Sequence, residues 1–113
     1  MLNLSAIREK GFSLVPMPEA PVPTVKFSGN GDGEAIAPLD RFLKVLHKNL
    51  VDDSSTEVYV DLCDLYFMNS SCLKAFVSWI YKVNTTGRPY QIHLQMNPRQ
   101  PWQRRSLEPL IIV

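Results

Sequence analysis

Two adjacent hydroxyl groups, those of Ser70 and Ser71, are the best placed for chemistry in this chain. They follow the apolar run Leu65–Met68 and precede a segment of helical periodicity, so we expect them in the first turn of a helix. The N–H groups and the dipole at a helix N-terminus favour an anion. A phosphoryl group on serine adds about −1.5 to −2 charges at neutral pH, which such a position tolerates. One interpretation of this position is therefore a phosphorylation site.

A helix cap explains the same residues. Asn and Ser are among the side chains that most often accept a backbone N–H bond at the N-cap, and Asn69 and Ser70 stand at the expected boundary. On spacing alone a cap is the commoner explanation, since capping needs only one frequent residue type. The two roles are compatible, because a cap lies where a phosphate is favoured.

The segments that would position these hydroxyls alternate between the periods of strands and helices. Apolar residues recur at helical spacing after the glycine-rich loop at 29–33 and again after Cys72. The expected strands are Thr24–Ser28, Glu57–Cys63 extended by Leu65–Met68, and Tyr90–Met96, and the expected helices cover 36–50 and 71–83. This order is typical of parallel strands joined by right-handed crossovers. We therefore expect an α/β fold with a largely parallel central sheet of about four to five strands and helices packed on it.

The middle strand and the chain ends carry further expectations. The near-continuous apolar run from Glu57 to Met68 predicts a central strand covered on both faces. Prolines at 16, 18, 21 and 23 exclude a helix there, so Phe12–Val15 is expected to be a short edge strand before a proline-rich loop. The resulting division is a lead-in at 1–23 and one domain at 24–113, with a short helix at Trp102–Leu110 and the start of a last strand at Leu110–Val113.

Length and composition limit the classes of function. A chain of 113 residues with 45% apolar and 20% charged residues fits one folded domain. The net charge of +1 does not indicate binding to nucleic acid or to an acidic membrane. No apolar run approaches the roughly 20 residues of a membrane span. Cys63 and Cys72 form neither a disulfide framework nor a metal-ligand spacing, so we expect a cytoplasmic protein without cofactor or metal.

Three other features have both a chemical and a structural explanation. Cys72 could be a reactive thiol, but neither His47 nor His93 is spaced to serve as its base, so we expect a buried hydrophobe and no enzyme activity. Arginines at 99, 104 and 105 surround Trp102, but they lack a basic surround, so a solvated helix face anchored by the tryptophan is expected. The second expected helix carries surplus apolar surface, which either binds a partner or lies under the proline-rich segment.

The strand at 58–62 and the loop at 67–73 resemble the signature of STAS domains, a family named for sulfate transporters and anti-sigma factor antagonists. In that family a strand of the form VVLDL leads to F-(I/M)-D-S-S-G-L, where this chain has VYVDL and FMNSSCL. Upstream, FSGNGD at 27–32 is similar to the family's L-S-G-E-L-D. The resemblance covers roughly residues 24–96 and implies a STAS-like fold. A bacterial STAS-like subgroup resembles this chain in both Asn-Ser-Ser-Cys and the later Trp-Gln-Arg-Arg-Ser, here at 102–106.

The resemblance implies a role for each matching residue. Ser70 matches the serine that a partner kinase phosphorylates, Ser71 could replace it, and Asp32 matches an acidic residue that faces it. Asn69 stands where many members have Asp, which removes a negative charge beside the phosphate, and Cys72 stands where Gly is usual. The implied partner-binding residues are Asp32, Asn30, Met68, Asn69, Ser71, Cys72 and Lys74. No catalytic residue is implied.

The implied function is that of an anti-sigma factor antagonist. Such a phosphoprotein binds other proteins in a bacterial partner-switching pathway of signal transduction and transcription regulation. The expected partners are a serine kinase or anti-sigma factor and a cognate phosphatase, with no nucleic acid and no membrane. The alternative is a constitutive STAS adaptor or oligomer subunit without a phospho-switch, and homodimerisation stays open.

Overall fold

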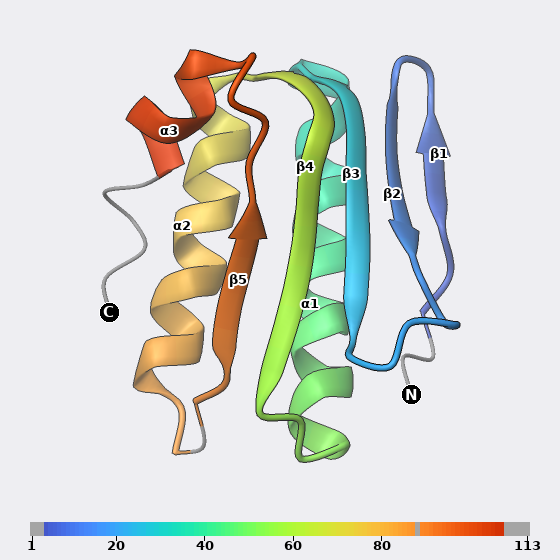
Figure 1. Ribbon diagram of the computed structural model, residues 1–113, viewed down its shortest axis with the longest axis vertical. Helices are drawn as coiled ribbons and strands as arrows, with labels where there is room; N and C mark the ends of the chain where they lie inside the picture. The colour runs from blue at the N-terminus through green and yellow to red at the C-terminus, as the bar shows by residue number, and fades with distance from the viewer. Residues whose placement is uncertain (1–3, 88, 108–113) are drawn as a thin grey trace.

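A five-stranded mixed sheet positions the two serines. The computed structural model describes residues 4–87 and 89–107. The strands lie in the sheet in chain order: β1 (Ile7–Glu9), β2 (Phe12–Pro16), β3 (Thr24–Gly31), β4 (Glu57–Met68) and β5 (Gln91–Gln95) (Figure 1). The pairs β1–β2 and β2–β3 are antiparallel, whereas β3–β4 and β4–β5 are parallel. The expected single α/β domain and strand number are confirmed, but only half of the strand pairs are parallel.

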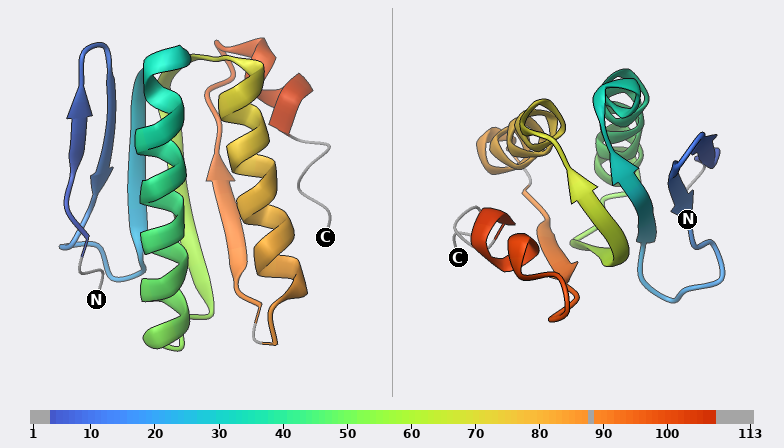
Figure 2. Two further views of the ribbon diagram at one scale, coloured as in Figure 1. Left: turned by 180° about the vertical axis from the view of Figure 1, so that it is seen from behind. Right: turned by 90° about the horizontal axis from the view of Figure 1, so that it is seen from above.

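Two long helices cover one face of this sheet. Their bounds are α1 (Ile36–Asp52), which follows a 3₁₀ turn at Gly33–Ala35, and α2 (Ser70–Thr85). Both lie on the same side of the strands (Figure 2). The cause is the strand order, because β3, β4 and β5 follow one another without reversal. Two crossovers of the same hand that advance in the same direction must fall on the same face of a sheet. No described helix is both long and apolar enough to cross a membrane.

The expectation that β4 is covered on both faces is wrong. Val58, Val60 and Leu62 alternate along β4 and are fully buried under the helices. Tyr59, which lies between them on the opposite face, is 39% exposed. Since both crossovers lie on one side, the other face of β4 meets solvent, and the aromatic residues of the apolar run make that face resemble a buried one in sequence.

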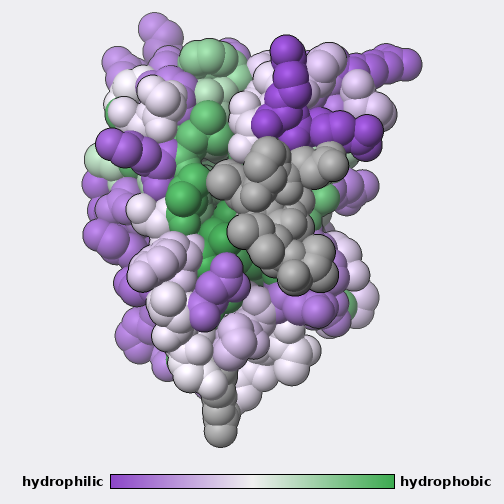
Figure 3. Space-filling view, turned by 90° about the vertical axis from the view of Figure 1, so that its left-hand side faces the viewer, coloured by the Kyte–Doolittle hydropathy of each residue, from purple (hydrophilic) through white to green (hydrophobic). Residues whose placement is uncertain are grey.

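A hairpin at the N-terminal end belongs to the same sheet. β2 pairs with β1 on one side and β3 on the other, so the segment predicted as an edge strand is an interior strand. Phe12 and Leu14 are buried in the shared core. The proline-rich loop connects β2 to β3 at the edge of the sheet remote from β5, so it does not cover α2. Apolar side chains instead form a band on the face beside α2 and α3 (Figure 3).

The third helix, α3 (Pro101–Leu107), closes an edge of β4 that β5 leaves open. The pairing of β4 with β5 ends at Asp61. Beyond that point the fully buried Gln103 donates from Nε2 to the carbonyls of Leu62 (2.8 Å) and Leu65 (2.7 Å), and its Oε1 accepts the Asn97 N–H (2.7 Å). Gln103 thus replaces the missing strand. The predicted last strand at 110–113 lies outside the described residues.

Candidate functional site

The loops that carry Asp32 and Ser70 lie side by side at the carboxyl ends of β3 and β4. The parallel register places Gly31 opposite Met68, and the N–H of Asn69 donates to the Gly31 carbonyl at 2.7 Å. A second link joins the Cys72 thiol to the Asp32 carbonyl at 3.6 Å. The two motifs that the sequence analysis identified separately therefore form one surface at the top of Figure 1.

Asn69, rather than Ser70, caps α2. Its Oδ1 accepts the Cys72 N–H at 2.8 Å, and its backbone is extended as the N-cap requires. Ser70 is the first residue of the helix, its side chain is exposed, and its hydroxyl has no hydrogen-bond partner among the described residues. Ser71 is exposed as well. The structural role therefore belongs to Asn69, and the hydroxyl of Ser70 is left without a structural task.

The remaining predicted residues divide between the surface and the core. Asn30, Asp32 and Lys74 are exposed. Asp32 also caps the 3₁₀ turn, because its Oδ1 accepts the Glu34 N–H at 3.1 Å. Met68 and Cys72 are buried beneath the loop, so their side chains support the surface from below and do not form part of it.

Electrostatics argue against a reactive thiol at this site. Burial raises the pKa of Cys72 above its ordinary value, and the negative charge of Asp32 raises it further. A thiolate nucleophile needs the opposite shift. The same effect shows that the negative charge of Asp32 acts on the first turn of α2. Lys74 supplies a positive charge one turn further along the helix.

A glycine fixes the Asp32 loop against the β1–β2 turn. Gly29 adopts a φ of +90°, and a Cβ at this position would collide with the carbonyl oxygen of Gly11. The next N–H, that of Asn30, donates to the same Gly11 carbonyl at 2.8 Å. Gly31 and Gly33 do not have positive φ, and β3 continues to Gly31, so only the first glycine of the predicted loop needs the left-handed conformation.

Two exposed aromatic residues beside the serines were not predicted as part of the site. Tyr66 is 55% exposed and Phe67 is 49% exposed, and both immediately precede the loop. Phe67 lies opposite Asn30 in the β3–β4 register. Consecutive residues of a strand point to opposite faces, so two adjacent aromatic residues cannot both face the core. The sequence could therefore have predicted that at least one of the two is exposed. Exposed aromatic side chains are typical anchors of protein interfaces.

The two histidines are held in other interactions. The Tyr90 hydroxyl accepts the Trp79 N–H (2.9 Å) and forms a second hydrogen bond of 2.7 Å with Nδ1 of His47. Burial lowers the pKa of His47, with a smaller effect from Lys82, and burial raises the pKa of Tyr90 to about 12. His93 stacks on Tyr59 across the open sheet face, with ring centroids 4.5 Å apart.

The remaining candidates lie in surface or core positions. The arginines at 99, 104 and 105 are exposed, while Trp102 is half-buried and packs against the core. Within residues 4–87 and 89–107 no group of three or more His, Cys, Asp or Glu residues could hold a metal ion.

Comparison with known proteins does not identify a family. The chain matches no protein-family model, and no curated protein matches its sequence. What is shown is a small α/β domain with a five-stranded mixed sheet and, among the described residues, three α-helices.

Proposed function

We propose that this chain is a cytoplasmic, phosphorylation-regulated binding module, similar to STAS-type anti-sigma factor antagonists, in a bacterial partner-switching pathway that regulates transcription. Ser70 is the phosphate acceptor. The observation that carries the proposal is the exposed hydroxyl of Ser70. Ser70 is the first residue of α2, but its hydroxyl has no structural role because Asn69 provides the cap. A kinase or anti-sigma factor binds the unmodified form, and a phosphatase restores that form.

The surroundings of Ser70 favour a switch that changes binding and leaves the fold intact. A phosphate at the first residue of a helix is stabilised by the dipole, by about 0.3–1 kcal/mol at an exposed position. Lys74 lies four residues further on, at the spacing of an ion pair across one helical turn. Asp32 opposes the new charge from the adjacent loop. The phosphate would therefore lie on the surface next to Tyr66 and Phe67. A partner that covers this surface would have to desolvate the phosphate, which lowers its affinity.

The topology also supports a macromolecular partner. In open α/β sheets small molecules bind in a crevice where the strand order reverses. The order β3–β4–β5 does not reverse, and both crossovers lie on one face, so the described strands contain no such switch point. Exposed aromatic side chains beside a free hydroxyl suit a protein surface better than a small-molecule pocket.

The second candidate is a constitutive adaptor or oligomer subunit. It is favoured by the same two aromatic residues, which could anchor a partner whether or not Ser70 is modified. The two candidates differ in one respect, namely whether a negative charge at Ser70 changes affinity.

Phosphosite mapping of the protein isolated from its host, in growing and in stressed cells, tests the proposal. We expect a single phosphate on Ser70 that Ser70→Ala abolishes. Ser70→Asp should weaken binding of the isolated kinase about tenfold or more, or about 1.4 kcal/mol, whereas Ser5→Asp, an exposed position at the other end of the sheet, should not. Absence of phosphate in both conditions, with equal affinities of the two Asp variants, would establish the constitutive adaptor instead.

A further inference from the structure

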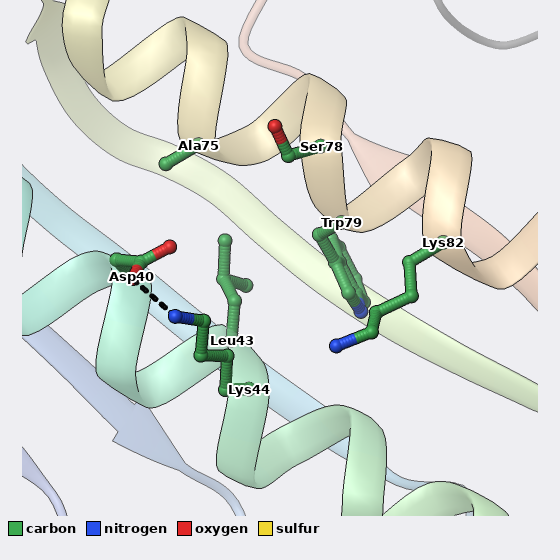
Figure 4. Close-up of a pocket in the computed structure, with 7 residues that line it drawn as sticks. All are labelled: Asp40, Leu43, Lys44, Ala75, Ser78, Trp79 and Lys82. Carbon is green, nitrogen blue, oxygen red and sulfur yellow. Dashed lines mark ion pairs between the residues drawn. The ribbon is translucent and has the colours of Figure 1, made fainter.

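A groove between α1 and α2 has features of a separate docking site. Leu43, Ala75 and Trp79 line it with apolar surface, and its charged lining consists of the Asp40–Lys44 ion pair of α1 and Lys82 of α2 (Figure 4). Its volume is about 80 Å³. Sites for small molecules typically enclose roughly 300–1,000 Å³. The groove therefore suits one inserted side chain of a larger partner better than a whole ligand.

The charges around the groove are unbalanced. Helices α1 and α2 carry five exposed Lys and Arg residues but only two Asp residues. Both Asp residues are already paired within α1, Asp40 with Lys44 at 3.0 Å and Asp52 with Lys48 at 2.8 Å. The residues without an acidic partner in the described part of the chain are Arg41, Lys74 and Lys82.

Lys82 is the cation that acts on the groove itself. Its side chain extends from α2 towards α1, beside the ring of Trp79 (Figure 4). Burial lowers the pKa of the neighbouring His47, and the positive charge of Lys82 lowers it further. A carboxylate placed in the groove would balance this charge, whereas a second cation there would be repelled.

We propose that the α1–α2 groove binds an acidic amphipathic helix of another protein. An apolar side chain of that helix enters the hollow between Leu43 and Trp79, and a neighbouring Glu or Asp residue pairs with Lys82. Packing of an amphipathic helix into an apolar groove is a recurrent mode of peptide recognition. A nucleic acid would meet the positive charges but has no aliphatic side chain for the hollow. The proposal does not depend on phosphorylation of Ser70, since the groove lies along the helices and not at the loop.

Two synthetic peptides of equal length test the proposal with the ¹⁵N-labelled protein. Both carry leucines at helical spacing, flanked by Glu in one peptide and by Lys in the other. We expect the Glu peptide to shift the amide signals of Ala75 and Ser78 and the indole signal of Trp79, and the Lys peptide to leave them unchanged. Lys82→Glu should weaken the Glu peptide about fivefold to tenfold, while Lys10→Glu, an equal charge change at an exposed β1–β2 turn, should leave binding unchanged.

The pKa of His47 gives a second, independent readout. Bound carboxylates should raise this pKa by offsetting the positive charge of Lys82. Equal shifts with both peptides, shifts confined to the open sheet face, or equal affinities of Lys82→Glu and Lys10→Glu would each overturn the proposal. Binding of anionic lipid vesicles at the groove without binding of the Glu peptide would also overturn it.

Discussion

Replacing Gln103 by leucine tests the closure of β4 by α3. The substitution keeps the approximate size of a fully buried side chain but removes its amide. Two carbonyl groups, those of Leu62 and Leu65, and the N–H of Asn97 then lose their partners. Each lost hydrogen bond costs about 0.5–1.5 kcal/mol, and a buried group left unsatisfied costs about 1–3 kcal/mol. The greater apolarity of leucine returns about 1–2 kcal/mol.

The net loss should be about 3 kcal/mol in the free energy of unfolding. A domain of this size has a total stability of about 5–15 kcal/mol, so the variant should fold but melt roughly 10–20 °C lower. Urea titration followed by circular dichroism measures the difference. Gln95→Leu, at an exposed position of β5, is the matched control and should change stability by less than about 0.5 kcal/mol.

The variant Gln103→Glu separates the hydrogen bonds from the shape of the side chain. An ionised carboxylate can accept the Asn97 N–H but cannot donate to either carbonyl group. Burial and the two facing carbonyls would raise its pKa in the folded state, so this variant should gain stability as pH falls and the carboxyl becomes a donor. If Gln103→Leu unfolds within about 0.5 kcal/mol of the wild type, the amide does not hold the edge of β4 and the reasoning is refuted.

Three further predictions concern the site and its supports. Asn69→Ala should lower the free energy of unfolding by about 1 kcal/mol and Ser70→Ala by less than about 0.5 kcal/mol, and equal losses in urea titrations would contradict the assignment of the cap. Stability should fall as pH drops below the ordinary histidine pKa of 6.5, because burial lowers the pKa of His47 in the folded state and the unfolded chain takes up the proton first. Urea titrations on either side of that pH should show a smaller fall for His47→Gln than for the wild type. Gly29→Ala should cost about 1–3 kcal/mol, because its φ is +90° and a Cβ would meet the turn carbonyl, whereas Gly33→Ala has open space; equal melting temperatures would exclude this explanation.

The sequence contained enough information for the helices and for the meeting of the two loops. The spacing of Leu39, Leu43, Leu46 and Leu50 predicts α1, and all four are buried as that spacing requires. The two loops follow neighbouring parallel strands, whose carboxyl ends necessarily share one edge of the sheet. Local periodicity and chain order were sufficient for both of these predictions.

The features that could not be predicted depend on distant partners. β1 has one apolar residue in three and exists because β2 offers it an edge. The exposure of Tyr59 follows from the placement of both crossovers on one face, which the composition of β4 does not encode. Gln103 satisfies carbonyl groups 38 and 41 residues earlier in the chain, and a single polar residue on a helix has no periodic signal.

The strand order has a consequence for folding during synthesis on the ribosome. Because β1 to β5 lie in the sheet in the order in which they are synthesised, each new strand meets an edge that has already emerged. Every strand after β1 has a partner encoded earlier in the message, and contacts between chain neighbours form quickly. α3, made after all five strands, then reaches β4 with Gln103. Translation and assembly of this sheet can proceed in the same direction.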